Sequence, residues 1–200
     1  MKLYYKAGAC SLASHIALSE AGVPFETESV DLATKVTATG ADFTKVNPKG
    51  YVPALLLDDG TVLTEGVAIM QYVADLRPAT GIAPANGTME RYRLQEWLHY
   101  IGSEVHKSFG PLFGPFPEEA KTALKERIRK RLGELDKHLA GREWLLDRFS
   151  VADGYAFTVV SWSKYVDIDL SPYPNVTAYL ERVAARPKVQ ATLKAEGLLG

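Results

Sequence analysis

The hydrophobic pattern of the chain changes near residue 77, and this change limits the folds that the sequence can adopt. Before that point, short apolar runs alternate with helix-length segments in the order β-α-β-α-β-β-α. The predicted strands are 2–5, 25–32, 54–57 and 61–63, and the predicted helices are 11–21, 42–46 and 65–74. After it, only helix-length segments follow, near 89–112, 118–139, 151–165, 176–185 and 188–195. The sequence therefore predicts a small α/β domain followed by an all-helical domain.

Residues 78–87 separate the two patterns. This stretch holds two prolines and two glycines, which interrupt both helices and strands. We therefore expect domains at 1–77 and 87–200. Within the second domain, Ser150 and Asp153 have the spacing of an N-terminal capping box, with aspartate in the place where glutamate is more usual. That motif predicts a helix that begins directly after Ser150.

The composition argues against several classes of function. The formal net charge of −1 provides no electrostatic basis for binding nucleic acid or an anionic membrane surface. No apolar stretch approaches the roughly 20 residues that cross a bilayer. The N-terminus does not have the pattern of a signal peptide, and the single cysteine can form no internal disulfide, so we expect a cytoplasmic protein. No cysteine pair or close histidine pair has metal-ligand spacing, so we expect no metal site.

The single cysteine, Cys10, lies where the first predicted strand gives way to the first predicted helix. A thiol at a helix N-terminus faces unpaired N–H groups and the positive end of the helix dipole, and both favour the thiolate. Lone cysteines are also common as small buried hydrophobic residues. Position alone therefore leaves a reactive thiol and a buried core residue as equal alternatives.

Two dipeptides flank the third and fourth predicted strands. A cis bond between Val52 and Pro53 would turn the backbone groups of Val52 outward, where they could pair with an extended peptide; the alternative is an ordinary trans proline that closes the preceding loop. Glu65-Gly66 begins a helix directly after a strand. The helix N-terminus suits a carboxylate and Glu65 suits an ammonium group, so the pair matches the α-amino acid end of a ligand. The alternative is that Glu65 only caps its helix.

Two histidines share one face of the long predicted helix at 89–112. At 100° per residue, His99, Ser103 and His106 lie within about 60° of one another, opposite the apolar side chains. A solvated helix face more commonly carries glutamate and lysine, so we interpret this face as the lining of a cleft or a partner surface. Lys35 follows the second strand in a polar loop and could pair with a ligand carboxylate, although by itself it reads as a surface lysine.

These motifs occur together in one frame, and in that combination the chain resembles the cytosolic glutathione transferases, specifically the bacterial beta class. The motifs are Cys10, Val52-Pro53, Glu65-Gly66 and Ser103-Glu104-Val105-His106. The resemblance implies a thioredoxin-like N-terminal domain, an all-helical C-terminal domain and a homodimer. It implies glutathione as a co-substrate, with no tightly bound cofactor, and a small hydrophobic electrophile as the second substrate.

The resemblance also implies a set of site residues. Cys10 and His106 are the implied catalytic pair, beside the glutathione sulfur. The backbone of Val52 would pair with the cysteinyl residue, and Ser103 and Glu104 would reach the site from the neighbouring subunit. His99 stands where members of the class often carry asparagine. The implied glutathione contacts are Cys10, Lys35, Val52, Glu65, Gly66, His99, Ser103, Glu104, Val105 and His106.

The main functional hypothesis is conjugation of reduced glutathione to small apolar electrophiles, a detoxification reaction. The electrophile would contact aromatic side chains such as Phe109, Phe113, Trp162 and Tyr165. Tyr5 and Ser11 are rivals of Cys10 as the group that activates glutathione. One alternative is thiol–disulfide exchange or reductive dehalogenation through a mixed disulfide on Cys10. Another is a non-enzymatic carrier that binds glutathione and apolar ligands.

Overall fold

Two units make up the computed structural model, which describes residues 1–199. The sheet unit consists of Met1–Ala85 together with the segment that begins at Pro187. The helical unit is Asn86–Arg186. The expected domains, 1–77 and 87–200, place the C-terminal segment with the helices, and the structure differs from that expectation.

A five-stranded sheet forms the centre of the sheet unit, in the order β3-β2-β1-β4-β5. Its strands are β1 (Lys2–Tyr5), β2 (Glu26–Asp31), β3 (Val36–Thr37), β4 (Ala54–Leu56) and β5 (Val62–Thr64). β1 and β2 run parallel, and the other neighbouring strands pair antiparallel. The sequence predicts four of these strands and misses β3, because two residues carry no alternating pattern. The strands predicted at 54–57 and 61–63 are confirmed as the hairpin of β4 and β5, whose turn contains Gly60 with a φ of 86°.

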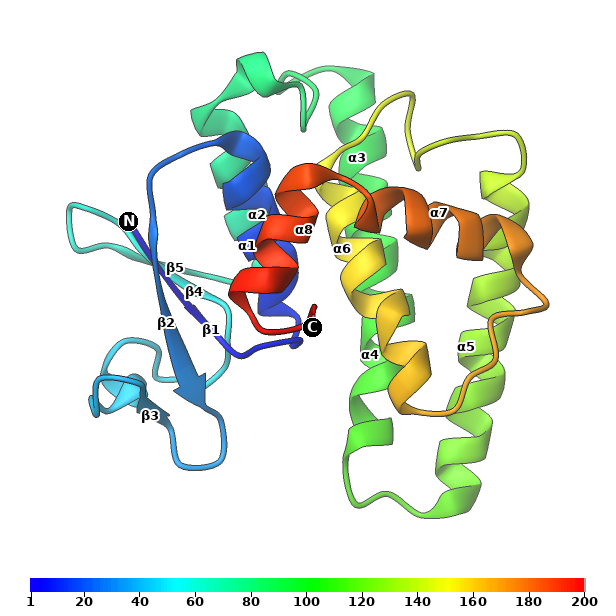
Figure 1. Cartoon of the computed structure of the whole chain (residues 1–200), viewed down its shortest axis with the longest axis horizontal. Coiled ribbons are helices and arrows are strands. Elements are labelled where there is room, and N and C mark those ends of the chain that lie inside the picture. Colours follow the sequence, from blue (N-terminus) through cyan, green and yellow to red (C-terminus); the bar gives the residue numbers. More distant parts are fainter. Residues whose placement is uncertain (200) are drawn as a thin grey trace. The chain divides into compact units, whose positions relative to one another are not determined.

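Three helices of the sheet unit lie together on one side of the sheet (Figure 1). They are α1 (Ser11–Ala21), α2 (Gly66–Leu76) and α8 (Pro187–Ala195). All but one of the residues of α1 are buried, because α2 and α8 both pack against it. On the other side of the sheet, a single turn of 3-10 helix at Phe43–Lys45 replaces the predicted helix 42–46 and adds its phenylalanine to a second core cluster.

Hydrogen bonds between α8 and α1 explain why the C-terminal segment belongs to the sheet unit. The Thr192 hydroxyl lies 2.8 Å from the Ser19 hydroxyl, and the Lys188 ammonium donates to the Glu20 carbonyl at 3.0 Å. The pattern of α8 is amphipathic like that of the preceding helices. Its periodicity therefore gives no sign of which unit it covers.

The helical unit contains five α-helices: α3 (Met89–Tyr100), α4 (Lys107–Phe109), α5 (Glu118–Leu139), α6 (Val151–Val160) and α7 (Pro174–Ala184). α6 begins with the predicted capping box, in which the Ser150 N–H donates to the Asp153 carboxylate at 2.8 Å. The predicted helix 89–112 contains a π-helical segment, Ile101–His106, between α3 and α4. With its sheet and helical units, the fold matches the predicted class of a thioredoxin-like domain joined to an all-helical domain.

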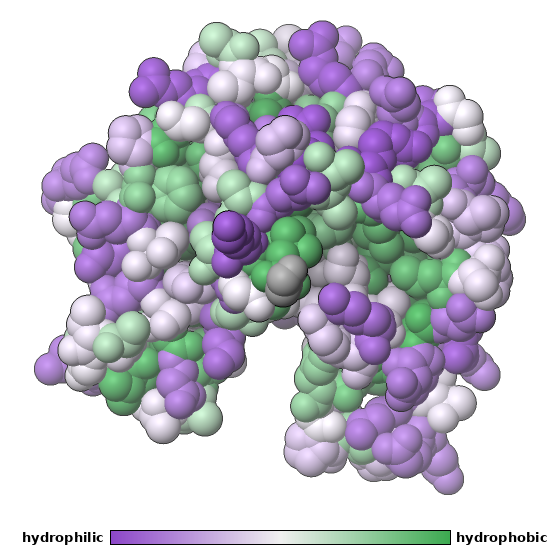
Figure 2. All heavy atoms as spheres, viewed as in Figure 1, coloured by the Kyte–Doolittle hydropathy of each residue, from purple (hydrophilic) through white to green (hydrophobic). Residues whose placement is uncertain are grey.

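The drawn face of both units is largely hydrophilic. Figure 2 shows polar side chains spread over this face and interrupted by small hydrophobic patches. Within the described residues, no helix is both long enough and apolar enough to span a membrane.

Candidate functional site

Cys10 and Val52 lie in contact, although 42 residues separate them in the sequence. Cys10 is the N-cap residue of α1, and its half-buried Sγ atom lies 3.3 Å from the carbonyl oxygen of Val52, to which the thiol donates. The Val52–Pro53 peptide bond is cis, which confirms the first of the two conformations considered for it. The exposure of the thiol and its polar partner favour a site residue over a core hydrophobic residue.

Glu65 does not cap α2 with its side chain. Its backbone has a φ of 67° and a ψ of 112°, outside the helical region, and its side chain makes no capping hydrogen bond. A non-glycine residue with such a backbone stores about 1–3 kcal/mol of strain, a cost that is concentrated at functional sites. The exposed carboxylate lies 2.7 Å from the Lys49 ammonium. The capping interpretation is therefore wrong, and the carboxylate faces outward, where it can meet a ligand.

Gly66 lies against the cis-proline loop. A Cβ built on Gly66 would lie 3.6 Å from Pro53 and 3.7 Å from the Ser14 hydroxyl, which are ordinary contacts. Lys35 reaches the same loop from the other side, because its ammonium donates to the Gly50 carbonyl at 3.1 Å. The segment 49–53 therefore contains one of the five predicted site residues of the sheet unit, Val52. It lies next to the other four, which are Cys10, Lys35, Glu65 and Gly66.

Four of the five predicted residues of the helical unit lie on the π-helix 101–106, and the fifth, His99, lies near the end of α3. A π-helix has i→i+5 hydrogen bonds and frequently marks a functional site. Because its turns are wider, the 100° spacing that aligned His99 with His106 does not hold across it. Ser103 is exposed, and His99 is exposed with its Nδ1 atom donating to the Gln95 carbonyl at 2.7 Å. Val105 is only 5% exposed, so its side chain is a core group rather than a ligand contact.

Glu104 is held by two arginines of α5. Its Oε2 atom accepts hydrogen bonds from Arg127 at 2.9 Å and from Arg131 at 2.5 Å. These bonds hold the pKa of the Glu104 carboxyl below its usual value, so the group is charged at neutral pH. The carboxylate has a fixed position on the surface of the helical unit.

His106 is uncharged at neutral pH. Burial, with a smaller contribution from the charge of Lys107, lowers its pKa to about 4. Its Nδ1 atom lies 2.7 Å from the Tyr155 hydroxyl, and its ring packs edge-on against Trp162 with a centroid distance of 5.1 Å. The imidazole is therefore fixed in orientation, with Nε2 as its second polar atom. Sequence reasoning missed Tyr155, because a tyrosine within an apolar helix has the pattern of a core residue.

Trp162 gathers most of the aromatic side chains that were expected to meet an electrophile. Phe109 and Phe113 pack edge-on against it with centroid distances of 6.0 and 5.9 Å. Phe113 is 54% exposed, so the cluster reaches the surface. Tyr165 is separate, with the Lys164 ammonium over its ring.

The two hydroxyl rivals of Cys10 are both less suited to activating a thiol. The buried Ser11 hydroxyl accepts from the Lys6 N–H at 3.1 Å and lies 3.2 Å from the Lys6 carbonyl, so it is engaged within its own loop. Burial, together with the charge of Glu196, raises the pKa of Tyr5, which keeps the phenol protonated.

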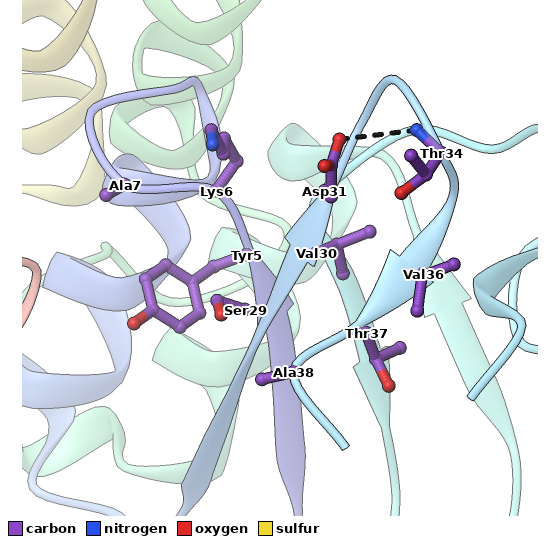
Figure 3. Close-up of a pocket in the computed structure, with 10 residues that line it drawn as sticks. All are labelled: Tyr5, Lys6, Ala7, Ser29, Val30, Asp31, Thr34, Val36, Thr37 and Ala38. Atoms are coloured by element: carbon purple, nitrogen blue, oxygen red, sulfur yellow. Dashed lines mark hydrogen bonds between the residues drawn. The ribbon is translucent and has the colours of Figure 1, made fainter. Parts of the chain in front are cut away.

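An open cavity of about 520 Å³ lies at the ends of β1 and β2 (Figure 3). Tyr5 and Ser29, which are register partners on these strands, lie side by side in it. Lys6 and Ala7 at its rim lead toward Cys10, but none of the predicted glutathione contacts lines it. Among residues 1–199, no group of three or more histidine, cysteine or acidic side chains could hold a metal ion.

Comparison with protein families identifies the family of the chain. The model of the glutathione S-transferase N-terminal domain matches residues 7–76, and that of the C-terminal domain matches residues 97–187. The chain belongs to the glutathione S-transferase family. It is therefore a transferase, as the sequence motifs predict.

Three bacterial members of the family are similar to this chain over its whole length. Glutathione S-transferase GstA of Escherichia coli O157:H7 is 50% identical over 200 residues, which cover 99% of this chain and 100% of GstA. The structure of a bacterial beta-class glutathione S-transferase from Sphingomonas chungbukensis is 52% identical, with a TM-score of 0.97 and full coverage of both chains. A sphingomonad glutathione S-transferase solved with glutathione is also 52% identical, with a TM-score of 0.96 and coverage of 99% and 100%. The predicted likeness to the beta class is confirmed.

Proposed function

We propose that this chain binds reduced glutathione through the sheet unit and conjugates it to small apolar electrophiles. The observation that carries the proposal is the segment 49–53, which joins the backbone of Val52, the Cys10 thiol, the Lys35 ammonium and the start of α2. Glutathione has a carboxylate at one end and an amine with a carboxylate at the other. The sheet unit offers a separate partner for each of these groups, and a relative of 52% identity was solved with glutathione.

Each group of glutathione has a chemically suitable partner. Lys35 would attract the glycyl carboxylate, and the outward-facing Glu65 carboxylate would meet the γ-glutamyl ammonium. The N–H groups at the start of α2, beginning at Gly66, would bind the γ-glutamyl carboxylate. The cysteinyl backbone would pair with Val52, whose carbonyl lies 3.3 Å from the Cys10 sulfur. A cysteinyl residue bound there would have its own sulfur beside Cys10.

In the proposed reaction the glutathione thiol loses its proton to solvent water, and the thiolate attacks the electrophilic carbon and adds to it or displaces a leaving group. A free thiol has a pKa of about 8.5, and each unit by which a site lowers it makes thiolate about 1.4 kcal/mol more favourable. The Cys10 thiol and the N-terminus of α1 would stabilise the charge. The resemblance to the beta class assigns the neutral His106 imidazole to the same task, as a hydrogen-bond donor.

The remaining assignments rest on the resemblance. We infer a homodimer in which His99, Ser103 and Glu104 belong to the glutathione site, with Val105 limited to backbone contacts. The surface around Phe113 and Trp162 would bind the apolar electrophile. The cytoplasmic location stays a prediction. Redox chemistry through a Cys10 mixed disulfide is not favoured, because relatives of 50% and 38% identity are named as glutathione S-transferases.

Conjugation of a chloronitrobenzene by purified variants tests the proposal. We expect Glu65→Gln to raise the KM for glutathione by about tenfold or more, because it removes a charge that the ammonium meets. Asp59→Asn is the matched control, since it removes another exposed carboxylate from the neighbouring hairpin, and its KM should be unchanged. Cys10→Ala should retain most of the conjugating activity.

Two results would contradict the proposal. If Cys10→Ala abolished turnover while glutathione still bound, Cys10 would be the nucleophile and the redox alternative would stand. If the unmodified protein turned over neither electrophiles nor disulfides and yet bound glutathione, it would be a carrier.

A further inference from the structure

We propose that Glu196, just beyond the end of α8, is a positioning residue whose buried carboxylate holds the loop between β1 and α1 in the conformation that presents Cys10 to glutathione. The inference rests on the proposed function in its reference to glutathione. It assigns a role in the site to the C-terminal segment, which the sequence places in the other domain.

The Glu196 carboxylate binds the chain on both sides of Cys10. Its Oε2 atom accepts a hydrogen bond from the Gly8 N–H at 2.9 Å, two residues before the cysteine. Its Oε1 atom accepts from Nδ1 of His15 at 2.8 Å, on α1 about one turn after the cysteine. One rigid group therefore fixes the loop and the helix relative to each other.

The carboxylate is in an environment where it needs these partners. The Glu196 side chain is 0% exposed and that of His15 is 5% exposed. Burying a charged group is costly unless it is paired and hydrogen-bonded, whereas an apolar residue would fill the same space at no such cost. A hydrogen-bonded carboxylate at this position therefore orients the two groups that donate to it, which apolar packing alone does not do.

The surroundings of His15 make the anchor stiff. Its ring lies between two aromatic rings, at a centroid distance of 5.8 Å from Tyr5 and 5.4 Å from Phe25. The histidine therefore cannot swing with the loop. Glu196 therefore connects the backbone of Gly8 to a histidine that is held in place by the core.

The end of the chain is shaped to bring Glu196 and its neighbours onto the loop. Gly197 has a φ of 70°, which ends α8, and the Leu198 N–H then donates to the Leu193 carbonyl at 2.8 Å. Leu198 lies over Gly8, because a Cβ on Gly8 would be 3.4 Å from its Cδ2 atom. The carboxylate and the leucine thus contact the same residue of the loop.

Hydrogen bonds within the loop do not fulfil this role. Ala9 N–H donates to the Lys6 carbonyl at 3.0 Å, and the Ser11 hydroxyl contacts both backbone groups of Lys6. These bonds set the shape of the loop and its junction with the start of α1. None of them involves the C-terminal segment, to which the Glu196 contacts join both Gly8 and His15.

The competing explanation is that Glu196 only fastens α8 to the sheet unit. Thr192 provides a matched control, because its hydroxyl bonds α8 to Ser19 of α1 at 2.8 Å and does not contact the loop. Thr192→Val removes that bond while preserving the shape of the side chain. Glu196→Gln likewise preserves shape, but places an amide N–H₂ against one of the two donors.

The single cysteine makes the test direct, since alkylation by iodoacetamide reports on Cys10 alone. We expect Glu196→Gln to slow this alkylation by about threefold or more, because the thiol leaves the N-terminus of α1, which favours the reactive thiolate. The KM for glutathione should rise by about threefold to tenfold, while the KM for the electrophile stays within about twofold. Thr192→Val should change none of the three.

His15→Phe, which keeps an aromatic ring in this place, is the second variant, in case Glu196→Gln does not fold. It removes one donor and leaves the bond to Gly8, so the same changes should appear with smaller size. The inference is overturned if the folded Glu196 or His15 variant behaves like Thr192→Val in alkylation and in KM for glutathione. Alkylation needs no glutathione, so a protein that failed to bind glutathione would contradict the proposed function and still test the role of Glu196.

Discussion

Asp153 in the helical unit and Glu196 in the sheet unit are both buried carboxylates, but they hold groups at very different separations along the chain. Asp153 accepts from the backbone N–H of Ser150 and Leu145, three and eight residues away, and from the Tyr179 hydroxyl. Glu196 accepts from groups 181 and 188 residues away. The first carboxylate organises the start of a helix, and the second joins the two ends of a unit.

This difference determines when each contact can form. Closing a loop costs conformational entropy that grows with its length, so the contacts of Asp153 to its near neighbours can form early. The contacts of Glu196 form only after β1, α1 and α8 have assembled. Contacts between remote residues stabilise the chain only once the entropy of closing the long loop has been lost. We therefore expect local changes at Asp153 to affect folding and changes at Glu196 to affect the site.

Replacing Asp153 should have the largest effect. Asp153→Ala leaves buried donors without an acceptor, so we expect the free energy of unfolding to fall by about 3–5 kcal/mol, measured by urea denaturation. Asp153→Asn keeps the shape and one acceptor oxygen, and should cost less. Cys10 alkylation in whatever fraction remains folded should be unchanged. A loss under about 1 kcal/mol for Asp153→Ala would show that this carboxylate does not stabilise the helical unit.

Glu28 in β2 is a second buried carboxylate of the sheet unit. Burial alone would raise its pKa, but hydrogen bonds from Thr37, Thr39 and Lys2 outweigh burial and lower the pKa to about 2. Because the pKa is lower in the folded state, Glu28 contributes stability above its unfolded value of 4.5, and this contribution is lost as the pH falls toward 2.

We expect Glu28→Gln to lower the free energy of unfolding near neutral pH by about 1–3 kcal/mol and to cost progressively less as the solution is acidified. Denaturation at a series of pH values measures this slope. Glu26→Gln, an exposed glutamate on the same strand, is the control and should leave the slope unchanged. An equal loss at acid and neutral pH would show that the charge of Glu28 does not stabilise the sheet.

The His106–Tyr155 pair should show the smallest effect. Burial is the first cause of the low pKa of His106, so Tyr155→Phe should leave the imidazole neutral above about pH 5 while removing one hydrogen bond, worth about 1 kcal/mol. Proton NMR of the imidazole and urea denaturation measure the two quantities. If the variant restored an ordinary histidine pKa, the hydrogen bond rather than burial would control the charge.

The low pKa of His106 also makes the free energy of unfolding depend on pH. Its folded pKa lies below the unfolded value of 6.5, so the unfolded chain takes up the proton first as the pH falls. His106 therefore makes the free energy of unfolding fall progressively as the pH is lowered from 6.5 to about 4. His106→Gln should reduce the acid sensitivity in that window.

Features of the fold that depend on neighbouring residues could be predicted. The hairpin turn at Gly60, the end of α1 at Gly22 and the capping box at Ser150 each combine a residue type with a fixed spacing. β3 and the π-helix could not, because two residues carry no periodicity and a π-turn has no simple residue code. The long apolar pattern of 89–112 instead suggested one regular helix.

The candidate site divides in the same way. Cys10, Val52 and Glu65 could be named because each stands at a strand or helix boundary whose chemistry is visible in the sequence. Glu196, like Tyr155, could not be named. Glutamate at the end of an amphipathic helix is usually solvated, and nothing near it in the sequence shows that it is buried.

Sequence patterns are sufficient to predict the two structural classes, most of the helix and strand boundaries, and the motifs that mark the glutathione transferase family. These follow from periodicity and from hydrogen bonds between near neighbours. The folded chain was needed to show that α8 belongs to the sheet unit and that Glu196 contacts Gly8 and His15. Burial and pairing of a charge with remote residues depend on which surfaces pack together after folding, and a local sequence pattern does not show which surfaces these are.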